Sequence, residues 1–297
     1  MTESVWKFKD WLLHIIDEYN PVQHYMLSIN PNSIWILYKN PTLINWYALS
    51  RNINAIDLLT ENQDKINWIL LSYNPSAFDL LSKNLDKIDW YGLSSNPCAI
   101  DILSNNINKI YWNRLSLNPN PDAIKLLLKY MDNINWYNLS SNPNAIDLLL
   151  ENPEKIDWKM LSSNPSAINL LSKNIDKIDW DKLSNNPNAI NILSQHLDKI
   201  NWEILSGNPN AINILTMNPD KIYWKVLLRN PNAIELLSKN LDKINDYYIL
   251  YNPNIFEIDY MYLKKRMNII SEELIKCALH PNRIQKMIDG GIFIEDL

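Results

Sequence analysis

Hydrophobic and polar positions recur along this chain with a period of 22 residues. The stretch WKMLSSNPSAINLLSKNIDKID, which begins at Trp158, shows the pattern. Further copies begin at His24, Trp46, Trp68, Trp90, Trp112, Trp136, Trp180, Trp202 and Trp224, and only the step from Trp112 to Trp136 is longer, at 24 residues. Self-similarity at a fixed period of this size indicates a repeat array, in which each unit packs on its neighbours.

One repeat, numbered from its Trp as position 1, begins its first predicted helix at positions 7 and 8. These hold Asn and Pro in nearly every copy, and the pair is typical of a helix start. Positions 10, 11, 13 and 14 are small or apolar, as in Ala145, Ile146, Leu148 and Leu149, and they form one stripe on a short helix. Asn at position 17 is expected to end this helix, because Asn tolerates the left-handed conformation.

The second helix of the repeat is predicted to start at once. Asp is usual at position 19 and Asp or Asn at position 22, as in Asp176 and Asp179, which resembles a capping box. This helix ends before the next Asn-Pro pair, since a residue before Pro resists the helical conformation. Helices of about two turns do not persist alone. The sequence therefore predicts an all-α protein, an α-solenoid of short helix pairs with helical caps at both ends.

A leucine-rich repeat is the alternative fold, because its period also fits 22 residues. Its strand needs Leu where this chain has Asp at position 12, for example at Asp57, Asp79 and Asp147. A charged residue at that position disfavours the strand, so the helical solenoid is the better interpretation.

Three regions are predicted. Residues 1–23 form an N-terminal capping helix, residues 24–267 form about eleven repeats, and residues 268–297 form a C-terminal helical cap. The last repeat is degenerate because Asp246 takes the place of Trp, and the two-residue insertion Asn120-Pro121 is expected to bend the array locally. Stacked helix pairs predict an elongated monomer, several times longer than wide.

Composition argues against catalysis and against cofactors. The chain has only four Gly and four His, and no phosphate-binding loop or Cys-x-x-Cys pair. The acidic residues at positions 19 and 22 recur along the array, as caps do, whereas an active site occurs once. No apolar run is long enough to span a bilayer. Cys98 and Cys277 are expected to be free thiols in a reducing compartment, which points to the cytoplasm.

Positions 2 and 6 of the repeat carry the best indication of binding. They lie one turn apart on a predicted helix, and they are often aromatic in the first half of the chain but polar or charged in the second. The candidate partner-binding residues are Tyr47, Arg51, Ile69, Tyr73, Tyr91 and Tyr137. An exposed aromatic row is typical of a protein-interaction scaffold, whose partner the sequence does not identify. The alternative is that these side chains pack between repeats.

Two other functions stay open. Lys at position 20, as in Lys65 and Lys177, could follow the phosphates of a nucleic acid. Asp precedes most of these Lys residues and the net charge is −5, so nucleic acid is the less favoured partner. A structural role in a virus particle is the third possibility.

The unit NPNAI…DKIDW resembles repeats in uncharacterised proteins of amoeba-infecting giant DNA viruses, mimivirus and its relatives. The resemblance covers roughly Pro21 to Asn254. It implies expression in the cytoplasm of a host cell or packaging in the virion, and it brings no known activity or catalytic residue.

Overall fold

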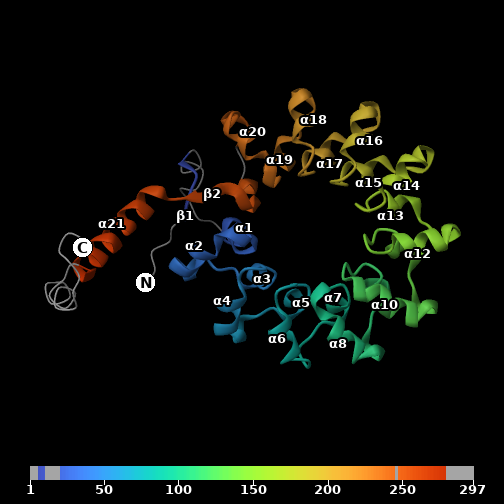
Figure 1. Ribbon diagram of the computed structural model, residues 1–297, viewed down its shortest axis with the longest axis horizontal. Helices are drawn as coiled ribbons and strands as arrows, with labels where there is room; N and C mark the ends of the chain where they lie inside the picture. The colour runs from blue at the N-terminus through green and yellow to red at the C-terminus, as the bar shows by residue number, and fades with distance from the viewer. Residues whose placement is uncertain (1–5, 11–20, 245–246, 279–297) are drawn as a thin grey trace, which may run out of the picture. The chain divides into compact units, whose positions relative to one another are not determined.

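The computed structural model describes residues 6–10, 21–244 and 247–278, and there the chain is an all-α repeat solenoid (Figure 1). It divides into two compact units. The repeat unit comprises residues 10–255, and the second unit comprises residues 1–9 together with residues 256–297.

Each repeat contributes one α-helix to the inner side of the repeat unit and one to the outer side (Figure 1). The inner helices begin at the Trp from the second repeat onward, and they are α1 (Pro21–Ile29), α3 (Trp46–Leu49), α5 (Trp68–Leu71), α7 (Trp90–Ser94), α9 (Trp112–Leu115), α11 (Trp136–Leu139), α13 (Trp158–Leu161), α15 (Trp180–Ser184), α17 (Trp202–Ser206) and α19 (Trp224–Leu227). The last repeat has the 3-10 helix η14 (Tyr247–Tyr251) in the corresponding place.

The outer helices are α2 (Ile34–Lys39), α4 (Ile56–Glu61), α6 (Phe78–Ser82), α8 (Ile100–Ser104), α10 (Pro121–Lys129), α12 (Ile146–Glu151), α14 (Ile168–Ser172), α16 (Ile190–Gln195), α18 (Ile212–Met217) and α20 (Ile234–Ser238). Short 3-10 turns join the helices: η2 (Pro31–Ser33), η3 (Pro41–Leu43), η4 (Gln63–Lys65), η5 (Pro97–Ala99), η6 (Ile107–Lys109), η7 (Met131–Asn133), η8 (Pro153–Lys155), η9 (Ile175–Lys177), η10 (Leu197–Lys199), η11 (Pro219–Lys221), η12 (Pro231–Ala233), η13 (Leu241–Lys243) and η15 (Pro253–Ile255).

The core lies between the inner and the outer helices. Leu139 at position 4, Ala145 at position 10 and Leu149 at position 14 are fully buried, and the equivalent residues are buried in the other repeats. Burying one Leu side chain stabilises a fold by about 1.5–3 kcal/mol. Because this stripe spans consecutive repeats, helices of four to six residues persist that would unfold in isolation.

The helix caps differ from the sequence prediction at two positions. The position 19 residue does not open the second helix: Asp176 lies in the 3-10 turn η9. The residue at position 22 is the cap instead, since Asp157 accepts a hydrogen bond from the main-chain N–H of Met160 at 2.8 Å. Position 17 does not adopt the left-handed conformation. Asn152 has φ −131°, and its side-chain amide donates to the carbonyl of Leu148 at 2.9 Å.

The Asn at position 7 links each repeat to the one before it. The side-chain amide of Asn164 donates to the main-chain carbonyls of Ser140 at 3.0 Å and Asn142 at 2.8 Å. Its Oδ1 accepts from the main-chain N–H of Ser166, so the same side chain caps the turn that follows. We call this series of buried bonds the Asn ladder. Its other rungs are Asn52, Asn74, Asn96, Asn118, Asn142, Asn186, Asn208, Asn230 and Asn252.

The Asn ladder closes the repeat unit on itself. Asn30 of the first repeat donates to the carbonyls of Leu250 at 2.8 Å and Asn252 at 3.0 Å, in the last repeat. Asn32 adds a bond to the carbonyl of Pro253 at 2.8 Å. The repeat unit is therefore a closed ring, and the prediction of an elongated array is wrong. Every repeat turns the chain in the same sense, and the turns together bring the last repeat back to the first (Figure 1).

The two-residue insertion leaves the Asn ladder intact. It lengthens α10 to nine residues, with Asn120 as its N-cap. Asn142, in the repeat that follows, still donates to the carbonyls of Ser116 and Asn118 at 3.0 and 2.9 Å. The extra residues are absorbed on the outer side of the ring.

The second unit contains a small antiparallel sheet and a helix. β1 (Trp6–Phe8) pairs with β2 (Phe256–Ile258) so that Lys7 lies opposite Glu257. An ion pair of 3.3 Å joins these two side chains, and the rings of Phe8 and Phe256 lie 4.8 Å apart. The helix α21 (Tyr260–Ala278) follows.

The elements at the two ends of the chain do not follow the predicted region boundaries. Residues 6–8 form a strand, and the alternation of apolar Trp6 and Phe8 with polar Lys7 is typical of one. The helix α1 begins at Pro21, inside the region predicted as the N-terminal cap. The remainder of the predicted N-terminal capping helix lies outside the described residues. The last repeat ends with η15 at Ile255, and α21 runs across the predicted boundary between residues 267 and 268. Residues 279–297 of the predicted C-terminal cap also lie outside the described residues.

Candidate functional site

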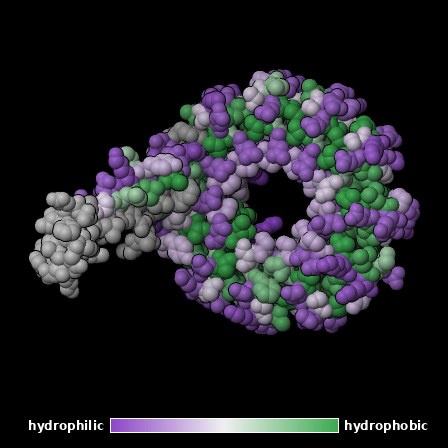
Figure 2. All heavy atoms as spheres, in the orientation of Figure 1, coloured by the Kyte–Doolittle hydropathy of each residue, from purple (hydrophilic) through white to green (hydrophobic). Residues whose placement is uncertain are grey.

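The inner helices border an opening in the repeat unit, which remains open when all atoms are drawn as spheres (Figure 2). Along these helices the position 2 side chain is exposed from the second repeat to the tenth. The inner helices therefore present a continuous surface, which we call the inner surface, whose chemistry is set by positions 2, 3 and 6.

All six candidate binding residues lie on or directly after inner helices. Tyr47 is on α3, Ile69 on α5 and Tyr137 on α11, with exposed fractions of 55%, 61% and 51%. These three side chains are large, apolar or aromatic, and open to solvent. They are therefore available for contact with a partner.

The structure brings the other three candidates together with two further residues, and we call the group the Tyr73 cluster. The guanidinium of Arg51 lies 5.9 Å from the ring centre of Tyr73, and that of Arg114 lies 5.8 Å from the same ring. Arg114 also lies 4.7 Å from the ring of Tyr91, which meets the ring of Tyr111 edge-on at 5.4 Å. Here the aromatic side chains do pack between repeats, as the alternative interpretation expected.

A second group of the same chemistry lies where the ring closes, and we call it the seam cluster. Arg229 stacks over Tyr248 at 4.3 Å and over Tyr251 at 4.7 Å, and Lys225 lies 4.7 Å from the ring of Tyr248. Tyr251 of the last repeat meets Tyr25 of the first edge-on, with ring centres 6.5 Å apart. Burial raises the pKa of Tyr251, and the neighbouring Tyr25 adds to this effect. The seam cluster connects both ends of the repeat series.

The remaining part of the inner surface is polar and carries charges of both signs. Asp181 accepts a hydrogen bond from the side chain of Asn201 at 2.8 Å, and Lys159 pairs with Asp179 at 3.9 Å. Glu203 is exposed.

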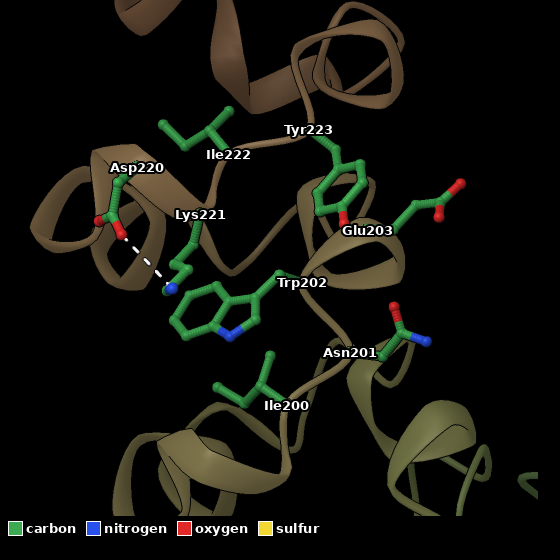
Figure 3. A pocket seen from close by; sticks show the side chains of 8 residues that line it. All are labelled: Ile200, Asn201, Trp202, Glu203, Asp220, Lys221, Ile222 and Tyr223. Atoms are coloured by element: carbon green, nitrogen blue, oxygen red, sulfur yellow. Dashed lines mark ion pairs between the residues drawn. The ribbon is translucent and has the colours of Figure 1, made fainter.

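A hollow of about 680 Å³ lies beside Glu203, between two consecutive repeats. Its lining includes the indole of Trp202, the ring of Tyr223 and the ion pair between Asp220 and Lys221, 3.5 Å long (Figure 3). It lies in the part of the ring where the predicted aromatic row is absent.

Seven of the eight Lys residues at position 20 contact another side chain of the chain. Lys65, Lys87, Lys109 and Lys177 lie 4.4–4.8 Å from the Trp ring of their own repeat. Lys199, Lys221 and Lys243 pair instead with the Asp that precedes each of them. The Trp side chains are half-buried, and a Lys ammonium over the ring is favourable by about 0.5–1 kcal/mol at such an exposed site.

Other chemistry is sparse in the part of the chain that the structure describes. No group of three or more His, Cys, Asp or Glu side chains there is placed to hold a metal ion, and no helix there is long and apolar enough to cross a membrane. Cys98 is a free, half-buried thiol, and its burial raises its pKa to about 11. The side chain of Cys277 lies outside the described part.

Sequence reasoning missed Arg114 and underrated Tyr111. Arg114 occupies position 3 of the repeat that carries the insertion, outside the two positions considered for binding. Tyr111 stands at position 22, where most repeats have the capping Asp or Asn. A signal was present in the sequence, since Arg114 is the only Arg at position 3 and lies three residues after an unusual Tyr.

Comparison with protein-family models, with curated proteins and with solved structures found no match to this chain.

Proposed function

We propose that this protein is a non-enzymatic scaffold whose inner surface binds a partner protein along the repeats from Tyr47 to Tyr137. The observation that carries the proposal is the exposure of Tyr47, Ile69 and Tyr137 on consecutive or nearby inner helices. The equivalent positions of the later repeats hold Lys159, Asp181 and other charged residues.

Large exposed aromatic side chains are costly to leave in water, and they are favoured at protein interfaces. Tyr combines apolar area with a hydroxyl group and loses little conformational entropy on binding. Packing between repeats accounts for Tyr73 and Tyr91, which touch Arg114. Among the residues that the structure describes, no such ring contact accounts for Tyr47 and Tyr137. The pattern therefore favours a partner over internal packing at these two positions.

A nucleic-acid partner has less support. Seven of the eight Lys residues at position 20 lie over Trp rings or beside Asp, and the chain carries a net charge of −5. A structural role in a virion follows only from the giant-virus resemblance, which stays a prediction, as does a location in the host cytoplasm.

The proposal is tested by partner recovery from producing cells. The tagged protein is compared with the variant Tyr47→Ala/Ile69→Ala/Tyr137→Ala, and the captured proteins are quantified by mass spectrometry. The matched control is Lys159→Ala/Asp181→Ala/Glu203→Ala, which changes the same position in three later repeats.

Proteins lost with the first variant and kept with the control are the expected result, provided both variants melt as the unchanged protein does. Equal recovery with all three proteins would mean that the binding surface is elsewhere. If the aromatic variant unfolds, the side chains are needed for packing and the proposal fails.

A further inference from the structure

We infer that the segment bound by the inner surface is an acidic peptide of the partner protein, recognised by Arg side chains that stack on Tyr rings. This inference rests on the proposed function and names the chemistry of the partner. It depends on ring closure, which the repeat pattern alone does not reveal.

Closure makes the two cationic clusters neighbours. The seam cluster spans the tenth, eleventh and first repeats, from Lys225 through Tyr251 to Tyr25. The second repeat carries the exposed Tyr47 and Arg51, and the Tyr73 cluster continues from there to Arg114 in the fifth repeat. Every repeat along this stretch of the inner surface, from the tenth through the point of closure to the fifth, therefore contributes a Tyr ring or an Arg or Lys side chain. We call this stretch the cationic arc.

The Arg side chains of the cationic arc have no acidic partner within the described residues. Arg51, Arg114 and Arg229 form no ion pair with a carboxylate there, and each lies over one or two Tyr rings instead. The Nε of Arg114 is buried and has no hydrogen-bond acceptor in the described part of the chain. Its Nη2 donates a hydrogen bond to the hydroxyl of Ser95 at 3.3 Å.

Stacking on a Tyr ring holds a guanidinium by its face and leaves the N–H groups at its edge available. Those N–H groups match the two oxygens of a carboxylate, and such charge-assisted pairs are among the stronger hydrogen bonds in proteins. Holding the side chain in advance also lowers the entropy that is lost on binding. The cationic arc is thus prepared for carboxylates, and the neighbouring Tyr47 and Ile69 supply apolar contact.

A peptide fits this surface better than a nucleic acid does. The rest of the inner surface carries Asp181 and Glu203 besides Lys159, so a polyanion that followed the whole opening would not meet a continuous row of cations. An acidic segment of peptide needs only the cationic arc, and residues flanking that segment can be neutral or basic. The proposal therefore commits to an acidic peptide, with single-stranded DNA as a competing outcome of the test.

The test measures fluorescence anisotropy of a labelled peptide of ten Glu residues with the full-length protein in low-salt buffer. We expect binding that weakens as salt is added, because the attraction is between exposed charges. A peptide of alternating Gly and Ser, equally long and uncharged, should not bind. This comparison uses the unchanged protein, so it does not depend on any variant folding.

The residues are tested with Arg51→Gln/Arg114→Gln/Arg229→Gln. We expect at least about tenfold weaker binding of the Glu peptide, since loss of about 0.5 kcal/mol for each of three charged contacts amounts to that factor. The matched control Lys83→Gln/Lys129→Gln/Lys173→Gln removes the same charge from exposed residues at the ends of outer helices, and it should bind within about twofold of the unchanged protein.

Three outcomes would overturn the inference: no binding of the Glu peptide at low salt, equal weakening by both variants, or tighter binding of a ten-residue oligothymidylate than of the Glu peptide. The proposed function is tested independently of this inference. If the Glu peptide does not bind but partner recovery still depends on Tyr47 and Tyr137, the scaffold stands and only the acidic chemistry is wrong.

Discussion

Asn30 and Asn252 lie 222 residues apart in the chain, and the side-chain amide of Asn30 donates a hydrogen bond of 3.0 Å to the main-chain carbonyl of Asn252. The bond between Asn164 and Asn142, in adjacent repeats, has the same donor and acceptor atoms and a length of 2.8 Å. The last repeat therefore contacts the first repeat through the same hydrogen bond that joins every other pair of adjacent repeats. An open solenoid exposes the core face of its end repeats and needs caps to cover them, whereas a closed ring covers both faces with its own repeats.

The Asn ladder should contribute strongly to stability. Asn164→Ala removes two buried hydrogen bonds and leaves the carbonyls of Ser140 and Asn142 without this donor. We expect a loss of about 2–4 kcal/mol in the free energy of unfolding, from lost bonds and unsatisfied buried carbonyls. Urea denaturation followed by circular dichroism measures it.

A matched variant tests the reason for that loss. Asn188→Ala removes an exposed hydrogen bond to the carbonyl of Pro165, so its cost should stay below about 1 kcal/mol. Equal costs for the buried and the exposed Asn would show that burial of the ladder does not matter.

The Trp residues at position 1 of the repeats should stabilise the fold, but replacing one should cost less than replacing a fully buried aromatic residue. Trp158 is half-buried beneath Lys177, whose ammonium lies 4.4 Å from the ring centre. Trp158→Ala should therefore destabilise the fold by about 2–3 kcal/mol, below the 3–5 kcal/mol of a fully buried aromatic residue. Lys177→Met should cost about 0.5–1 kcal/mol, and Lys159→Ala, which breaks only an exposed ion pair, less than about 0.5 kcal/mol. Denaturation of all three variants gives this ranking, and a larger effect of Lys159→Ala than of Trp158→Ala would contradict the assigned helix faces.

Gly92 leaves room for the Tyr73 cluster. A Cβ at this position would come within 2.6 Å of the Tyr73 ring, so Gly92→Ala must displace the ring on which Arg114 lies. We expect a loss of about 1–3 kcal/mol from overpacking, together with weaker binding of the Glu peptide.

Gly207→Ala is the control for this change, because its Cβ would meet Val226 at 3.3 Å, and a small shift of that side chain relieves the contact. Thermal melting of both variants should show the larger decrease for Gly92→Ala. If both variants melt at the same temperature and bind the Glu peptide equally well, the close approach of Gly92 to Tyr73 contributes neither to stability nor to peptide binding.

The thiol of Cys98 should react slowly at neutral pH. Burial raises its pKa to about 11, so the reactive thiolate is rare below pH 9. In Cys277→Ser protein, alkylation by iodoacetamide should rise with pH toward about 11 in the folded state. In urea the rise should centre near the ordinary thiol value of about 8.5.

The raised pKa of Cys98 also makes the stability of the fold decrease at high pH. The folded thiol keeps its proton to higher pH than the unfolded thiol, so the stability that the protonated form contributes is present below the unfolded pKa. It is lost as the pH rises through the folded pKa. A folded-state alkylation profile that matched the profile in urea would show that Cys98 is not shielded.

The pattern of apolar residues was enough to predict the helices and the core. Ala145 and Leu149 lie on one stripe because a helix places them there, and no knowledge of other repeats was needed. The capping prediction identified Asn at position 7 but not its second bond, because a cap needs only the side-chain oxygen. Asn occupies position 7 even in the last repeat, where Trp is lost, and this strictness indicates that the amide donor is needed as well.

Ring closure could not be predicted from the sequence because it depends on the angle between successive repeats. Many small packing contacts together determine that angle. The candidate surface was predicted at Tyr47 and Tyr137, whose exposure follows from helical spacing. The pairing of Arg114 with Tyr73 and Tyr91 was not predictable, because it joins residues of three repeats through their stacking.

Closure of the ring is tested most directly by disulfide trapping between its first and last repeats. Asn32→Cys and Pro253→Cys, in a Cys98→Ala/Cys277→Ser background, place two thiols where Asn32 now bonds to Pro253. Asn54→Cys with Pro31→Cys is the equivalent pair in adjacent repeats, and Asn32→Cys with Pro165→Cys is a pair from distant repeats. Under mild oxidation of dilute protein, we predict that the 32–253 disulfide forms as readily as the 54–31 disulfide. A 32–253 pair that cross-links no faster than the 32–165 pair would contradict the closed ring.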